Sequence, residues 1–422
     1  METMNHRIEL TDLPAELLFL IFRQAHSVQP QSRIYSILRL VCRALDRVAT
    51  QLVFQEFTAT ISSSTSSESL ETLQTIFENH AHCIRSLTIH NTISRKREVE
   101  KQTISRIAQH ITERGCFLCT KIRSLACLGS HGMFSSRSWL SLPMPPNLTS
   151  LTFTPNKGST DLSYCLLALK DSLRSLEIIN WRPQHDNPPT FHLPTSLPHL
   201  TDLTLTGCYP PPPHIQKLFS RFITPSSPQN AAPAVALHSL TVRPESGYEP
   251  DFRFPSILAD IVSILSTRQF GARLRTVCIG SPRFYHMEAT IPIMLLRLCP
   301  NLVEFTYHCE RVNQNVLSSL PSTLEVLELS PCLFANTFDA SPHGDILSPT
   351  FLALWLRDGP QQKRSAPGLR RVTVNVSGRD LCDMLEVLEG SQPDGTHTSV
   401  SADCFTCIDI HLEGETFQVT PS

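Results

Sequence analysis

Two pairs of cysteines have the spacing that metal-binding and thiol-redox sites use. Cys116 and Cys119 form one C-x-x-C motif, and Cys404 and Cys407 form the other. Each pair could supply half of a tetrahedral zinc site or the two thiols of a redox centre. The pairs stand near opposite ends of the repeated region described below, so we do not expect them to meet in one site. We interpret them as packed or incidentally exposed thiols.

The sequence shows no other pattern of catalytic or metal-ligating residues. Its 17 histidines are scattered, without H-x-x-x-H or H-E-x-x-H spacing. No G-x-S-x-G, P-loop or G-x-G-x-x-G motif occurs. We therefore predict a protein that is not an enzyme and that has no cofactor and no metal site.

Charge and hydropathy narrow the classes of partner. The chain has 36 basic and 38 acidic residues among 422, a net charge of -2, so electrostatics give no reason to expect nucleic acid or a membrane partner. The apolar run IPIMLLRLC, from Ile291, is too short to span a bilayer and contains Arg297. The N-terminus lacks the basic-then-apolar start of a secretory signal. We expect a soluble protein of the cytoplasm, the nucleus or both.

A short leucine-rich phrase recurs along the chain. LTDLTLTGC, from Leu200 to Cys208, has apolar residues at offsets 0, 3 and 5 and a cysteine at offset 8, and LEVLELSPC repeats it from Leu324 to Cys332. Starts are 22 to 45 residues apart, which is typical of a repeat array, and offsets 3 and 5 give the strand period of two. The eleven windows begin at Ile84, Ile122, Leu148, Leu173, Leu200, Leu237, Leu274, Leu302, Leu324, Leu369 and Phe405.

Segments with helical spacing follow many of these windows. Examples are PSILADIVSILSTR from Pro255 and ATIPIMLLRLCP from Ala289. A single strand, turn and helix cannot bury its own apolar face, whereas stacked units bury a continuous core.

The repeated phrase resembles the consensus of the leucine-rich repeat family, L-x-x-L-x-L-x-x-N/C. The resemblance implies an α/β solenoid of the irregular, ribonuclease-inhibitor-like type, a horseshoe with an inner parallel sheet and outer helices. Offsets 2, 4 and 6 would then point out from the concave face. We expect the charged residues at these offsets to bind a protein substrate with a basic or hydroxyl-rich segment: Glu177, Asp202, Arg243, Glu304 and Glu328.

The N-terminal segment has more apolar surface than a small helical segment can bury. LTDLPAELLFLIF, from Leu10 to Phe22, places Pro14 in the first turn of a predicted helix and then six apolar residues in a row. In LRLVCRALDRVATQLVF, from Leu38 to Phe54, apolar residues recur with helical spacing. We expect another protein to cover part of this surface.

LPAELLFLIF and LVCRALDRVA together resemble the F-box, a three-helix module. The resemblance implies docking on the Skp adaptor and, through it, on a cullin, as the substrate-recognition subunit of a ubiquitin ligase. Two features depart from the usual pattern: Leu45 stands where an aromatic residue is common, and the intervening stretch is longer. By position in the motifs, the adaptor-binding residues would be Leu13, Pro14, Leu17, Ile21, Phe22, Leu38, Val41, Cys42, Leu45 and Val48.

These resemblances divide the chain into an F-box (residues 1–56), a serine-rich linker with an N-terminal cap helix (57–80) and the irregular repeats (81–422). The alternative function is a leucine-rich-repeat scaffold whose N-terminal helices cap the solenoid and recruit no ligase. The two functions predict different packing. Adaptor docking requires exposed apolar side chains on the N-terminal helices, whereas a cap packs them on the first repeat.

Overall fold

The computed structural model divides the chain into two compact units, Met1–Arg174 and Ser175–Ser422, which are described separately. The described residues are 14, 17–18, 20–21, 43–62, 65–91, 114–115, 118–129, 145, 147–155, 166–182, 197–224, 234–235, 237–244, 254–268, 270–280, 290–308, 312–329, 347, 349–358, 366–377, 384, 405–413 and 416–421.

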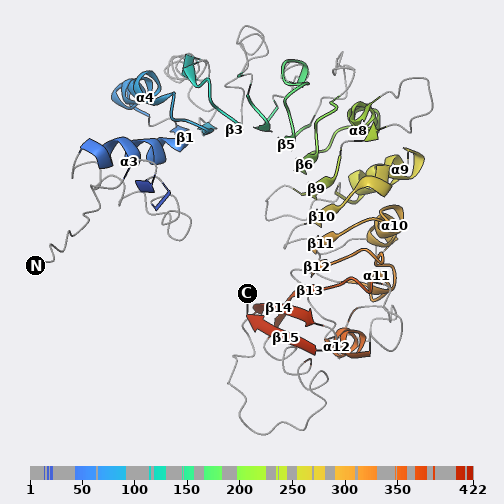
Figure 1. Ribbon diagram of the computed structural model, residues 1–422. Coiled ribbons are helices and arrows are strands. Elements are labelled where there is room, and N and C mark those ends of the chain that lie inside the picture. The colour runs from blue at the N-terminus through green and yellow to red at the C-terminus, as the bar shows by residue number, and fades with distance from the viewer. Residues whose placement is uncertain are drawn as a thin grey trace, which may run out of the picture. The chain divides into compact units, whose positions relative to one another are not determined.

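The first unit contains a parallel sheet with the strand order β1-β2-β3-β4 (Figure 1). Helix α3 leads directly into β1, and α4 follows it. The elements are α3 (Arg43–Gln55), β1 (Glu56–Ile61), α4 (Ser67–His80), β2 (Ser86–Asn91), β3 (Ser124–Gly129) and β4 (Ser150–Phe153).

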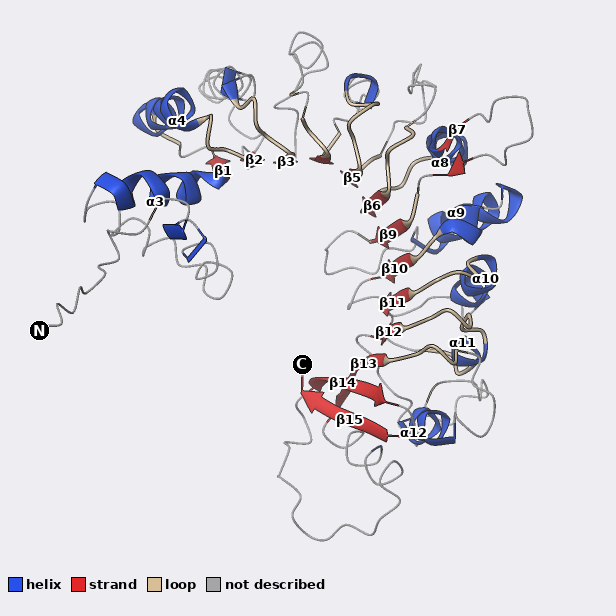
Figure 2. Cartoon of the chain, viewed as in Figure 1, coloured by secondary structure: helices blue, strands red, loops and turns tan. Residues whose placement is uncertain are grey.

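The second unit alternates strands with helices. Its strands lie in the order β5-β6-β9-β10-β11-β12-β13-β14-β15, and they run parallel as far as β13. Its helices α8 to α12 all lie on one side of the sheet (Figure 2). The strands are β5 (Ser175–Ile179), β6 (Asp202–Thr206), β7 (Ile223–Thr224), β8 (Ala234–Val235), β9 (Ser239–Arg243), β10 (Thr276–Gly280), β11 (Glu304–His308), β12 (Val326–Leu329), β13 (Arg371–Ser377), β14 (Phe405–Glu413) and β15 (Thr416–Pro421). The helices are α8 (Pro212–Phe219), η2 (Ser220–Phe222), α9 (Phe254–Arg268), η3 (Phe270–Arg273), α10 (Thr290–Leu298), α11 (Asn315–Ser318) and α12 (Pro349–Asp358).

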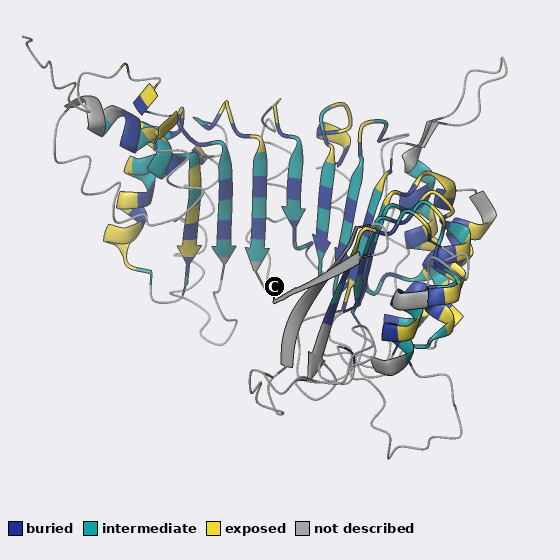
Figure 3. Ribbon diagram, turned by 60° about the horizontal axis from the view of Figure 1, so that its bottom comes forward, coloured by how far each residue is buried: buried dark blue, intermediate teal, exposed yellow. Residues whose placement is uncertain are grey.

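The repeated phrase builds the core of both units. In the first ten windows, the residues at offsets 0, 3 and 5 are all buried, whereas most residues at offsets 2 and 4 are only partly buried. This alternation is visible along the strands in Figure 3. The predicted α/β class and the parallel strands are therefore confirmed: eleven strands run parallel to their sheet neighbours, four in the first unit and seven in the second.

Two strands differ from the predicted array. Strand β1 is parallel to β2 but is not among the eleven windows, although its register aligns Phe57 with Leu87 and Ala59 with Ile89. Phe405, the start of the eleventh window, begins β14, which runs antiparallel to β13 and pairs with β15. The array of parallel units thus ends in a hairpin, which pairs with the last parallel strand.

The helices predicted from Pro255 and from Ala289 occur as α9 and α10. α9 buries Leu258, Ile261, Val262 and Leu265, the i, i+3, i+4, i+7 stripe of an amphipathic helix. α10 contains most of the apolar run that begins at Ile291, and it ends at Leu298. Both helices lie between consecutive parallel strands, as the crossover of a parallel sheet requires.

Candidate protein-docking surfaces

The first described helix begins at the proline that its sequence indicates. The carbonyl oxygen of Pro14 accepts hydrogen bonds from the amides of Leu17 at 3.0 Å and Leu18 at 3.1 Å. Pro14 itself is exposed. Proline suits this place because the first turn of a helix needs no amide donor.

One face of this helix presents three large apolar side chains to solvent. Leu17 is 47%, Leu20 57% and Ile21 46% exposed. Their i, i+3, i+4 spacing places them on one face, while Leu18 is 1% exposed. We call Leu17, Leu20 and Ile21 the apolar triad. Three further large apolar residues are exposed among the residues that the structure describes, Leu167, Met294 and Leu354, and each lies on a separate helix.

Helix α3, in contrast, is anchored to the first repeat. Val48 and Ala49 are buried, and the ring of Phe54 stacks on His80 of α4, with centroids 4.2 Å apart. Phe57, on β1, packs against the edge of Phe77 at 5.8 Å. The C-terminal half of α3 therefore has the packing expected of a solenoid cap.

Four of the ten adaptor-binding residues predicted from sequence have described side chains. Leu17 and Ile21 lie exposed on one face, Pro14 lies exposed at the helix start, and Val48 is buried. Leu45 belongs to α3, although its side chain is outside the described set. Leu13, Phe22, Leu38, Val41 and Cys42 lie outside the described residues. The motif comparison missed Leu20, which the i, i+3 spacing from Leu17 would have identified.

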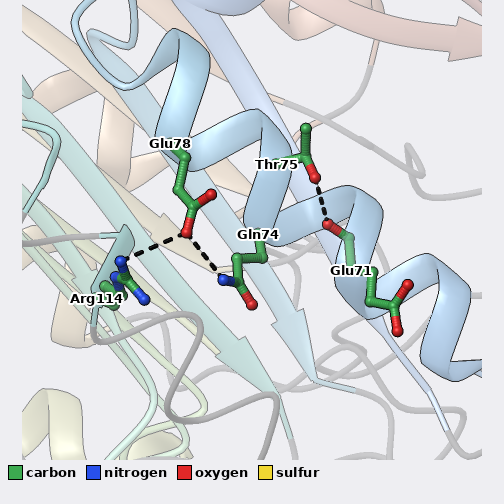
Figure 4. Close-up of polar contacts among 5 residues, drawn as sticks. All are labelled: Glu71, Gln74, Thr75, Glu78 and Arg114. Carbon is green, nitrogen blue, oxygen red and sulfur yellow. Dashed lines mark hydrogen bonds and ion pairs between the residues drawn. The ribbon is translucent and has the colours of Figure 1, made fainter.

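Helix α4, in the same unit, has polar side chains on its exposed face. Ser66 caps its N-terminus by accepting from the Ser69 amide at 3.2 Å. Glu78 accepts from Gln74 at 2.8 Å and pairs with Arg114 at 3.4 Å (Figure 4). Because the exposed side of α4 is polar, the exposed leucines of the first helix depart from the pattern of the unit.

The five residues predicted to bind substrate all lie on the second unit, at outward positions of its strands. Glu177, Asp202, Glu304 and Glu328 are partly buried and Arg243 is exposed. In the β-sheet register Glu177 is aligned with Thr204, and Glu328 with Thr306. We call the side of this sheet that faces away from α8–α12 the outward face.

Hydrogen bonds between strands orient two of these carboxylates. The hydroxyl of Thr306 donates to Oε2 of Glu328 at 3.1 Å, and that of Thr206 donates to Oε1 of Glu177 at 3.5 Å. Arg243 reaches Sγ of Cys278 at 3.9 Å, near the middle of the face. Thr306, which donates to Glu328, is buried, with 7% of its surface exposed.

The six cysteines whose side chains the structure describes are all buried, as packed thiols are. Burial raises the pKa of Cys119, the described member of the first C-x-x-C pair, to about 12. Cys116 and Cys404 lie outside the described residues, and Cys407 lies in β14. A thiol with so high a pKa carries little thiolate near neutrality, so Cys119 is a poor nucleophile and a poor metal ligand.

Within the described ranges, no three histidine, cysteine or acidic side chains are grouped so that they could hold a metal ion. No helix in the described parts of the chain is both long enough and apolar enough to cross a membrane. Comparison of the sequence with protein-family models and with curated proteins gives no match.

Proposed function

We propose that this chain is a substrate-recognition subunit of a Skp–cullin–F-box ubiquitin ligase. The N-terminal segment docks on the Skp adaptor, and the irregular leucine-rich repeats bind the protein to be ubiquitinated. The observation that carries the proposal is the exposure of the apolar triad on one face of the helix that begins at Pro14. Contiguous exposed apolar side chains are typical of a protein-binding surface.

The proposed division of labour follows from the chemistry that the described residues offer. The repeats supply a long sheet face with partly buried charged and hydroxyl side chains, such as Glu304 and Thr241. The described cysteine thiols whose pKa departs from its ordinary value all have it raised by burial, as at Cys299. On this proposal the chain selects the substrate, while its partners transfer the ubiquitin.

The packing of α3 favours the second candidate, a scaffold without a ligase role. Phe54 and Val48 bury this helix as a cap would be buried. The apolar triad separates the two candidates because a cap has no use for three exposed apolar side chains. On the F-box proposal, α3 both closes the first repeat and supports the docking helix.

The experiment that tests the proposal compares surface variants in a pull-down with co-expressed Skp adaptor and cullin. Leu17→Asp combined with Ile21→Asp is expected to abolish capture, because a carboxylate cannot be buried unpaired in an apolar interface. Leu167→Asp combined with Met294→Asp is the matched control, since these side chains are 53% and 48% exposed on other helices. Capture that survives in the triad variant removes the F-box assignment.

A further inference from the structure

A row of basic residues lies at the edge of the first unit where its strands begin. Arg85, Arg123 and Arg174 occupy offset 1 of their repeats, and Lys121 stands two residues before Arg123. Lys121, Arg123 and Arg174 are exposed, and Arg85 is partly buried. We call these four residues the basic edge.

Main-chain hydrogen bonds fix the order of the row. The amide of Arg123 donates to the carbonyl oxygen of Arg85 at 2.7 Å, and the amide of Thr149 donates to that of Arg123 at 2.9 Å. The amide of Arg174 donates in turn to the carbonyl oxygen of Thr149 at 2.8 Å. With about 4.8 Å between neighbouring strands, the three steps from Arg85 to Arg174 span about 14 Å.

A second row, of hydroxyl groups, runs beside the first. The sheet register aligns Ser86 with Ser124 and Ser124 with Ser150. Ser86 and Ser124 directly follow Arg85 and Arg123, and Ser150 follows Thr149. All three serines are partly exposed. Arginine and lysine side chains carry only donors, and serine hydroxyls donate as well, so the two rows together present donors to a negatively charged partner.

In the described part of the first unit, acidic residues stand near the two ends of the row. Glu56 begins β1 at one end of the row, and Asp171 stands next to Lys170 before Arg174. Arg85 donates to the carbonyl oxygen of Lys121 at 3.5 Å, which draws its guanidinium over the next repeat. In the second unit, offset 1 carries residues of both charges. Glu325 and Arg370 both occupy this offset, and they form an ion pair at 3.9 Å.

We propose that the basic edge and its serine row form a docking site for an acidic, extended segment of a partner protein. Carboxylates match the forked donors of arginine, and the row has the length of about four extended residues. Nucleic acid is a poorer match for two reasons. Proteins bind it with broad basic surfaces, whereas the basic edge is a single narrow row at the start of the strands. The chain as a whole also has a net charge of -2. The site does not depend on adaptor docking, which involves the apolar triad.

The test measures fluorescence anisotropy of a labelled peptide of alternating glutamate and serine, titrated with the full-length chain. We expect saturable binding that weakens with added salt, and a loss of about tenfold or more in affinity for Arg123→Glu with Arg174→Glu. Arg275→Glu is the matched control: Arg275 occupies the same offset in the second unit and donates to the Asn301 carbonyl oxygen at 3.3 Å. Its affinity for the peptide should be unchanged.

Two results would overturn the proposal: no binding by the natural chain, or equal binding by the charge-reversed variant. Tighter binding of a single-stranded oligonucleotide of the same length would assign the row to nucleic acid instead. Circular dichroism shows whether each variant is folded. If Arg123→Glu with Arg174→Glu does not fold, Arg123→Gln with Arg174→Gln removes the charges without reversing them, and the same loss of affinity is expected.

Discussion

The thiol of Cys208 donates a hydrogen bond to the main-chain carbonyl oxygen of Ile178, at an Sγ–O distance of 3.0 Å. Cys208 stands at offset 8 of its repeat, just after β6, and Ile178 lies in the neighbouring strand β5. The bond ties the turn after one strand to the strand before it. In this repeat the donor at offset 8 satisfies a main-chain acceptor of a buried residue.

Replacing Cys208 tests this bond. We expect Cys208→Ala to lower the free energy of unfolding by about 1–2 kcal/mol, because it removes both a buried sulfur atom and the donor. Cys208→Ser keeps a donor of similar size and should cost less than the alanine variant. Chemical denaturation of the three proteins measures the difference. Equal losses in the two variants would show that packing, and not the hydrogen bond, accounts for the cysteine.

Buried thiols also make stability depend on alkaline pH. Burial raises the pKa of Cys119, Cys208 and Cys299 from 9.0 to about 12. An unfolded thiol loses its proton near pH 9, whereas the folded one keeps it, so this contribution is complete below pH 9 and is lost as pH rises toward 12. Each thiol contributes up to about 1.4 kcal/mol per pH unit in this window.

Thermal midpoints measured across that pH window provide the check. Cys299→Val removes one of the three thiols, and its midpoint should fall less steeply with pH than that of the natural chain. Identical slopes in the two proteins would contradict the assignment of the pH dependence to buried thiols.

The repeated strands could be predicted from the sequence because each repeat has the same spacing of apolar residues, which the hydrophobic effect buries. Leu200, Leu203 and Leu205 point inward for the same reason as Leu324, Leu327 and Leu329, so a single template finds both strands. The residues at offsets 3 and 5 alternate with polar ones, and burial follows that alternation. The fold class was therefore predictable from local periodicity.

Features that depend on neighbouring strands were not predictable in this way. Nothing in FTCIDIHL, which begins at Phe405, indicates that it pairs antiparallel with β13, because alternation is the same in both directions. The basic edge was missed for a similar reason: Arg85 and Arg123 are 38 positions apart in sequence and adjacent only through the ladder. The apolar triad was only partly predicted, since Leu20 needed the helical geometry that a motif does not state.

Gly280 provides a test of how tightly two repeats approach each other. It ends β10 with a φ of +94°, and a Cβ atom there would overlap the carbonyl group of His308 on β11. We expect Gly280→Ala to lower the free energy of unfolding by about 2–4 kcal/mol through strain and displacement of the strand. Gly368→Ala is the control, because a Cβ there would lie at an ordinary 3.4 Å from the Leu324 carbonyl oxygen. Similar midpoints for the two variants would contradict the close approach.

The packing of α3 determines how the N-terminal segment should be tested. Phe54 is buried against His80, and it belongs to residues 1–56, the segment assigned to the F-box. Deletion of this segment also removes Glu56, the first residue of β1. A truncated chain would therefore lose the cover of its first repeat together with any docking surface, so failure to capture the adaptor would have two explanations.

Stability measurements separate these two effects. Phe54→Ala should lower the free energy of unfolding by about 3 kcal/mol, because it leaves a cavity between α3 and α4. Leu17→Asp with Ile21→Asp should leave the thermal midpoint nearly unchanged, since both side chains are exposed, while it abolishes adaptor capture. If the triad variant instead unfolds as readily as Phe54→Ala, the triad is part of the cap, and the scaffold is the better description of the N-terminus.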